Sequence, residues 1–169
     1  MKIGGGGSDN ANILFSDNVT LRNEDAVVAD DHAFFFGGGL SQAASNYSHG
    51  QVFNPSGSGI VTFIDGFVFE AQTGSVIIIG FYDTELTTDA GAFLNKRNAG
   101  AAGASHFRTQ LSTSRLGTYW YGNALAALSP WIQPLIYPVE LAAGEGFIMA
   151  MNTVNADAYL TFTIREYTA

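Results

Sequence analysis

The chain has 169 residues, a length typical of one domain and sufficient to bury a core without disulfides. Its 47% hydrophobic and 13% aromatic content excludes a disordered chain, and the absence of cysteine excludes cysteine-ligated metal sites. The net charge of −8, with only seven scattered lysines and arginines, argues against a nucleic-acid partner. No apolar run reaches transmembrane length and no signal-peptide core is visible, so we expect synthesis in the cytoplasm and no membrane partner.

The shortage of charge is the most informative feature of the composition. Charged residues make up 13% of the chain, against the roughly 25% that is usual for soluble proteins. A chain with so few charges is expected to cover much of its surface with copies of itself or with a larger assembly. A neutral surface of Ser, Thr, Asn and Gly is the alternative explanation.

The N-terminal region is predicted to be a flexible arm over residues 1–22, ahead of a β-sandwich domain over residues 23–169. Residues 4–8 are a Gly-Ser run with the composition of a linker, native or added. Three short segments separated by turn-forming residues are candidate strands: residues 12–15, 19–22 and 26–29.

Three consecutive phenylalanines, Phe34, Phe35 and Phe36, follow. Because neighbouring residues of a strand point to opposite faces, they cannot all enter one core. Either both faces are buried there or one of them meets a partner chain.

The middle of the chain predicts strands at residues 51–53, 60–71 and 75–82. The Asn-Pro-Ser-Gly-Ser-Gly sequence before residue 60 predicts a turn, because proline fixes φ and glycine permits positive φ. Residues 75–82 are apolar on both faces, which predicts a central strand.

Residues 83–104 are polar and rich in Ala and Gly, and predict a long surface loop with one helical turn. Strands are expected near residues 105–109 and 117–121, and a short helix between Gly122 and Ser129. The segment after it holds three of the four prolines, which indicates an irregular or edge strand.

The last strands are the clearest in the sequence. From residue 146, two strand-like segments flank a polar turn at residues 152–157, and the second alternates with a period of two. This pattern predicts a terminal β-hairpin. With about ten to twelve strands and almost no helical period, the chain predicts an all-β, single-domain antiparallel β-sandwich of jelly-roll type.

No set of residues forms a recognisable catalytic or metal-binding motif. Asp30, Asp31 and His32 could bind a divalent ion, but a polar turn explains them equally well. The loop acids Asp83, Glu85 and Asp89 lack the ordered spacing of a calcium loop. There is no nucleophile elbow, and the glycine runs lack the lysine of a phosphate-binding loop. We therefore expect no enzyme activity, no catalytic residues, no cofactor and no metal.

An aromatic group stands out instead: Tyr119, Trp120, Tyr121 and Trp131. Such side chains dominate strand cores and protein interfaces, and exposed aromatic rings also stack on sugars. All three interpretations stay open at this point.

The segment QVFNPSGSGIVTFIDGFVF resembles a pattern found in virion proteins of tailed bacteriophages, where a short strand ends in an Asn-Pro-small-Gly-Ser-Gly turn and enters a long apolar strand. The segment PVELAAGEGFIMAMNTVNADAYLTFTIREY is similar to the way in which such proteins end. The two matches cover residues 51–82 and 138–167. The chain therefore resembles the small β-sandwich structural proteins of phage virions, which include capsid decoration (cement) proteins and fibre heads.

This resemblance implies a non-enzymatic virion protein, most simply a capsid decoration protein bound to the capsid as a homotrimer. Its expected partners are its own copies and the major capsid protein or another virion protein. A receptor- or glycan-binding head of a fibre or tail is the alternative. The candidate interface residues are Ile13, Leu14, Phe15, Phe34, Phe35, Phe36, Tyr119, Trp120, Tyr121 and Trp131.

Overall fold

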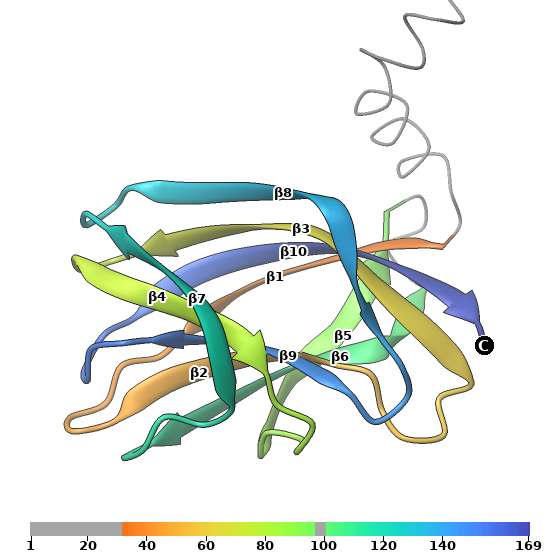
Figure 1. Cartoon of the computed structure of the whole chain (residues 1–169), viewed down its shortest axis with the longest axis horizontal. Helices are drawn as coiled ribbons and strands as arrows, with labels where there is room; N and C mark the ends of the chain where they lie inside the picture. Colours follow the sequence, from red (N-terminus) through yellow and green to blue (C-terminus); the bar gives the residue numbers. More distant parts are fainter. Residues whose placement is uncertain (1–31, 97–100) are drawn as a thin grey trace, which may run out of the picture.

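The computed structural model describes residues 32–96 and 101–169, which form ten β-strands and no helix (Figure 1). The predicted arm over residues 1–22 and the strand candidates within residues 12–29 lie outside this part. Within the described residues, no helix that could cross a membrane is present.

In chain order the strands are β1 (Ala33–Leu40), β2 (Tyr47–Phe53), β3 (Ile60–Ala71), β4 (Ser75–Phe81), β5 (Thr88–Asn95), β6 (Ala102–Ser112), β7 (Thr118–Leu125), β8 (Pro130–Leu141), β9 (Gly146–Met151) and β10 (Ala158–Thr168).

All ten strands belong to one curled antiparallel sheet with the order β7-β4-β9-β2-β6-β5-β1-β10-β3-β8. Four strands at one end, β8-β3-β10-β1, form what we call sheet I, and four at the other end, β7-β4-β9-β2, form sheet II. The chain crosses repeatedly between the two, as in a jelly roll. The β5–β6 hairpin is inserted between β1 and β2 and joins the two sheets along one flank (Figure 1). The predicted jelly-roll-like fold class is confirmed.

The core lies between the sheets and is built from the inward face of each strand. Along β10, buried and exposed residues alternate as predicted. The ring of Phe162 on β10 lies 5.8 Å from that of Phe107 on β6 and 6.1 Å from that of Phe67 on β3. Because such rings bury large apolar areas, these contacts join strands that are distant in sequence.

The prediction of a terminal β-hairpin is wrong. The turn between β9 and β10 is where the sequence places it, with Asn155 at φ 57°. However, β9 pairs with β2 and β4 in sheet II, whereas β10 pairs with β1 and β3 in sheet I. The turn therefore carries the chain from one sheet to the other.

Two further predictions are corrected by the structure. The predicted loop over residues 83–104 contains β5 and the start of β6, whose Ala/Gly-rich strands pair with each other despite two register shifts. The predicted helix after Gly122 is instead the end of β7 and a turn, because residues there extend the pairing with β4. The predicted edge strand in the proline-rich segment is confirmed as β8.

Two connections cover the outer face of sheet II. Residues 82–87, between β4 and β5, are held by the buried side chain of Gln51, whose Oε1 accepts a hydrogen bond from Leu86 N at 3.0 Å. Residues 113–117, between β6 and β7, are held by the buried side chain of His49. Every residue of β9, in the middle of this sheet, is consequently buried.

Candidate interaction site: the aromatic seam between the edge strands

The strands β7 and β8 each have only one hydrogen-bonded neighbour in the described sheet. They follow one another in the chain and diverge from the turn that joins them, on the flank opposite the β5–β6 hairpin (Figure 1). The two free edges of the sheet therefore lie on the same side of the molecule. Free edges present unpaired backbone groups and are natural points of contact with another chain.

A row of aromatic side chains bridges these edges, and we call Phe81, Trp120, Tyr121 and Trp131 the aromatic seam. Ring centroids lie 6.5 Å apart for Phe81 and Trp120, 6.2 Å for Trp120 and Tyr121, and 5.6 Å for Tyr121 and Trp131. Trp131 then meets Phe67 edge to face at 5.0 Å. The row runs from the surface into the core.

A β-bulge brings Trp120 into this row. Tyr119 pairs with Gly80 and Tyr121 pairs with Ile79, so Trp120 is an extra residue opposite no partner on β4. A bulge re-aims the side chains around it. Trp120 and Tyr121, although adjacent in sequence, therefore both reach the seam.

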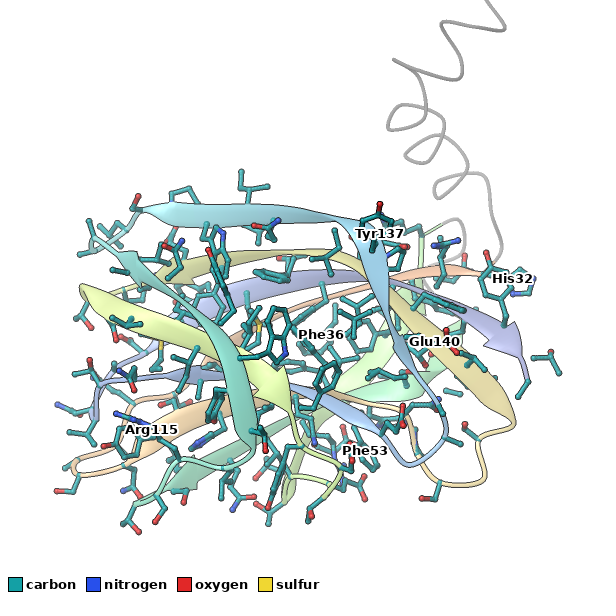
Figure 2. The ribbon with its side chains drawn as sticks, viewed as in Figure 1. His32, Phe36, Phe53, Arg115, Tyr137 and Glu140 are labelled. Carbon is teal, nitrogen blue, oxygen red and sulfur yellow. The ribbon has the colours of Figure 1, made fainter. Side chains whose placement is uncertain are left out.

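The seam is open to solvent on β7 and closed on β8. Trp120 is 54% exposed and Tyr121 49%, while Trp131 is buried. On β8, residues 135–138 fall out of register with β3, and Tyr137 at the resulting bend is 87% exposed (Figure 2). Trp120 and Tyr121 are adjacent, half-exposed rings, and an exposed apolar cluster of this kind marks an interaction site.

The structure buries some of the other predicted interface residues and exposes others. Phe34 is buried in the core, and Phe36 stacks on Phe107 at 4.6 Å. Phe35 points outward, away from both of them, and Tyr119 is half-buried. The candidates Ile13, Leu14 and Phe15 lie outside the described residues.

Sequence reasoning missed three members of this flank: Phe81, Ile132 and Tyr137 are exposed there. The proline spacing around Tyr137 was the available signal, since prolines at an edge strand break its register.

Two of the predicted loop acids, Glu85 before β5 and Asp89 within β5, form ion pairs. Glu85 and Asp89 both pair with Arg108, at 2.6 and 3.1 Å, and Asp89 also meets His106 Nδ1 at 2.8 Å. Slight burial raises the pKa of Asp89, but the Gly91 N–H, His106 and Arg108 together outweigh it and leave that pKa low. Within the described residues no group of three or more His, Asp or Glu side chains could hold a metal ion.

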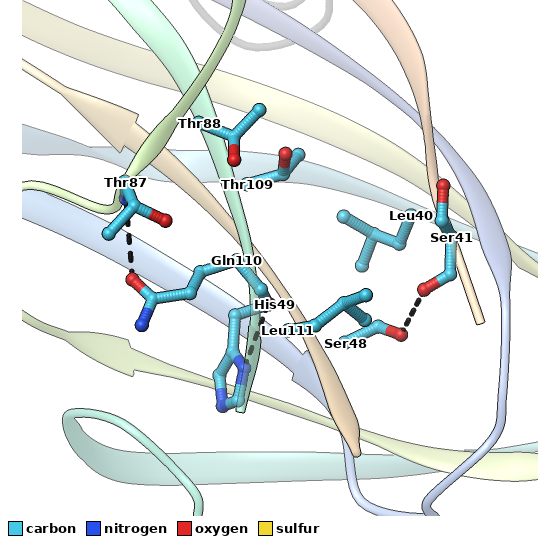
Figure 3. Close-up of a pocket in the computed structure, with 9 residues that line it drawn as sticks. All are labelled: Leu40, Ser41, Ser48, His49, Thr87, Thr88, Thr109, Gln110 and Leu111. Atoms are coloured by element: carbon cyan, nitrogen blue, oxygen red, sulfur yellow. Dashed lines mark hydrogen bonds between the residues drawn. The ribbon is translucent and has the colours of Figure 1, made fainter. Parts of the chain in front are cut away.

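A hollow of about 430 Å³ opens between β5, β6 and the start of β2 (Figure 3). Three of its polar lining side chains, those of Ser48, His49 and Gln110, are hydrogen-bonded to the main chain. The Ser48 hydroxyl lies within hydrogen-bond distance of the Ser41 and Ala156 carbonyl oxygens, and Gln110 Oε1 accepts from Thr87 N. Ser48 and His49 therefore form no nucleophile–base pair at this hollow.

His49 is a structural residue with a depressed pKa. Nδ1 lies 3.2 Å from the Gln110 carbonyl oxygen, to which it donates, and Nε2 accepts from Leu116 N at 3.1 Å. Burial lowers the pKa of His49 and outweighs the opposing main-chain hydrogen bonds. The neutral ring thus tethers the β6–β7 connection.

Acid is expected to loosen this connection. Because the pKa of His49 in the folded state is below its ordinary 6.5, its contribution to stability is complete above that value and is lost as pH falls through the lower, folded pKa. Urea unfolding between pH 7.5 and 5 should show no loss from His49 above about pH 6.5, and below it a loss of up to about 1.4 kcal/mol per pH unit. The His49→Gln variant should show a shallower dependence, and an equally steep one would contradict this role.

Comparison of the chain with protein-family models, with curated proteins and with solved structures finds no match.

Proposed function

We propose that the chain is a non-enzymatic structural protein that assembles with its own copies, and that it is the capsid decoration protein of a bacteriophage virion, a homotrimer on the capsid surface. The observation that carries the self-assembly is the aromatic seam, in which the half-exposed Trp120 and Tyr121 lie beside two free sheet edges. The virion location is what the sequence resemblance implies.

The chemistry of the seam favours a protein partner. Trp and Tyr are the side chains most enriched at interface hot spots, because they bury a large area at a low entropic cost. The formal charge of −8 disfavours anionic partners such as nucleic acid or an acidic membrane surface. An apolar seam on a weakly charged chain suits permanent burial against another subunit.

Sedimentation velocity and immunogold microscopy test the two parts of this proposal. The purified 17.9-kDa chain should sediment as a trimer, and antibody label on particles should lie over the shell. A chain that stays monomeric at micromolar concentration would overturn the self-assembly. Label confined to the tail would overturn the decoration role but not the assembly.

Removal of residues 1–22 is expected to weaken attachment to the particle and to leave the sheet folded. Extended segments outside a domain bind neighbours by adding a strand to a free edge, and β7 and β8 supply such edges. Co-sedimentation with shells measures attachment, and circular dichroism checks the fold. Normal coating of shells by the truncated chain would refute a role for these residues.

A receptor- or glycan-binding head is the second candidate function. It is favoured by the stacked, solvent-open rings of Phe81 and Trp120, because such rings bind the apolar faces of sugars. A glycan array and cell binding with the wild type and with Trp120→Ala would decide. A blank array and no cell binding would exclude this candidate.

A further inference from the structure

The outer face of sheet I differs sharply from that of sheet II. Sheet II is covered by the two connections that Gln51 and His49 hold. Among residues 32–96 and 101–169, no connection covers sheet I in this way. Exposed side chains on the outward face of β3, β10 and β8 include those of Val68, Tyr159, Thr161 and Ile132. Val68 is 37% exposed, and Tyr159 and Ile132 are more open still.

The strand register arranges this face in rows. Ile132 on β8 lies beside Val68 on β3, which lies beside Thr161 on β10 and then Gly37 on β1. We call these four residues, together with Tyr159 and Gly39 in the next row, outer face I. A shallow hollow of about 310 Å³ lies over β3 and β10, lined by Val68, Glu70, Tyr159, Leu160 and Thr161.

Outer face I carries a single carboxylate. Glu70 lies beside Tyr159 and lines the hollow, and its Oε1 accepts a hydrogen bond from Gln72 Nε2 at 3.0 Å. Farther along the same strands, Arg165 forms a bidentate pair with Asp65, with Nε–Oδ2 at 2.8 Å and a terminal guanidinium nitrogen (Nη2) to Oδ1 at 2.7 Å. On a chain with a net charge of −8, a face with so little charge is where two copies can approach with the least repulsion. A basic partner would require acidic side chains here, and an anionic partner would require basic ones.

We propose that outer face I receives the aromatic seam of a second copy of the chain, an inference that rests on the proposed self-assembly. The strand β8 borders both surfaces, since Trp131 points into the seam and its neighbour Ile132 points outward. The protruding Trp120 ring of one copy fills the hollow beside Val68 in the next. Each subunit uses two different surfaces, so the contact is head-to-tail rather than two-fold, and three such contacts close the proposed trimer into a ring.

A complementation experiment tests this arrangement by sedimentation velocity. The face variant carries Val68→Glu and Thr161→Glu, and the seam variant carries Trp120→Glu. Each should sediment as a monomer, because every contact in a head-to-tail ring joins one seam to one face. An equimolar mixture should form a dimer, since the intact seam of one variant still fits the intact face of the other. The control is Leu111→Glu on β6, outside both surfaces. Leu111 is 43% exposed and Val68 37%, so the two sites are similarly open, and the control variant should still sediment as a trimer.

The other outcomes overturn the inference in distinguishable ways. If the wild type is oligomeric and the face variant is equally so, outer face I is not the interface, although the proposed function stands. If the mixture stays monomeric, the two surfaces do not meet. A monomeric wild type overturns the proposed self-assembly as well. If circular dichroism shows a misfolded double variant, the single change Ile132→Glu, on the same face, gives the same test.

Discussion

Replacing Gly80 with alanine is expected to destabilise the protein by about 3 kcal/mol or more, the upper range for overpacking. A Cβ at this position would overlap the Thr118 carbonyl oxygen and lie 2.7 Å from the Thr118 carbonyl carbon and 2.8 Å from Tyr119 Cα. These atoms are main chain, so no rotamer change can relieve the clash. The substitution must push β7 away from β4 at the bulge that presents Trp120.

Urea unfolding of Gly80→Ala, followed by tryptophan fluorescence, measures this loss. Gly74→Ala is the matched control, because its Cβ would make an ordinary contact of 3.6 Å with the Leu125 carbonyl oxygen, and Gly74 lies outside the aromatic seam and outer face I. Alanine restricts the unfolded chain more than glycine does, so the control should be neutral or slightly stabilising. Equal midpoints for the two variants, compared at one protein concentration, would contradict the close approach of β4 and β7.

Glu166→Ala is expected to lower the free energy of unfolding by about 3 kcal/mol, because it leaves buried N–H donors unpaired. The carboxylate is 6% exposed and accepts hydrogen bonds from Ala104 N at 2.9 Å and from Ser105 N at 2.7 Å. These donors are free because β6 is out of register with β5 at this point. The carboxylate thus fastens the inserted hairpin to β10.

A graded series tests this role of Glu166. Glu166→Gln keeps one accepting oxygen and should lose less stability than Glu166→Ala. Glu145→Ala is the matched control: its exposed carboxylate accepts from Ala142 N at 2.7 Å, and such an exposed bond contributes only about 1 kcal/mol. A loss for Glu166→Ala no larger than that of the control would show that the buried bonds are not important. Chemical shifts of the Ala104 and Ser105 amides would report the contact directly.

Local patterns predicted the elements whose signal lies in consecutive residues. The strand Ile60–Ala71 has the bounds that its apolar run and preceding turn indicate, and the alternation of β10 was visible residue by residue. Prolines marked β8 as an edge, because a residue without an N–H cannot serve a central ladder. The uncertainty at the three phenylalanines is resolved: Phe34 and Phe36 point inward and Phe35 points outward.

Pairing between distant segments could not be predicted in this way. β9 and β10 look like a hairpin because a good turn joins them, yet each finds its partners far away in sequence. The β5–β6 hairpin was missed because small residues carry little periodic signal, and its position depends on β1 and β2. The sequence named Trp120, Tyr121 and Trp131 of the seam but not Phe81, because the membership of the seam depends on a bulge and on the curl of the sheet.

The β5–β6 insertion has one more consequence. A sandwich of two separate sheets has four open margins, whereas in the described part of this chain the insertion leaves only those of β7 and β8, side by side. One neighbouring subunit can therefore cap both at once. In the proposed ring no free edge would remain as a template for further sheet growth, which would protect a weakly charged protein from forming fibrils.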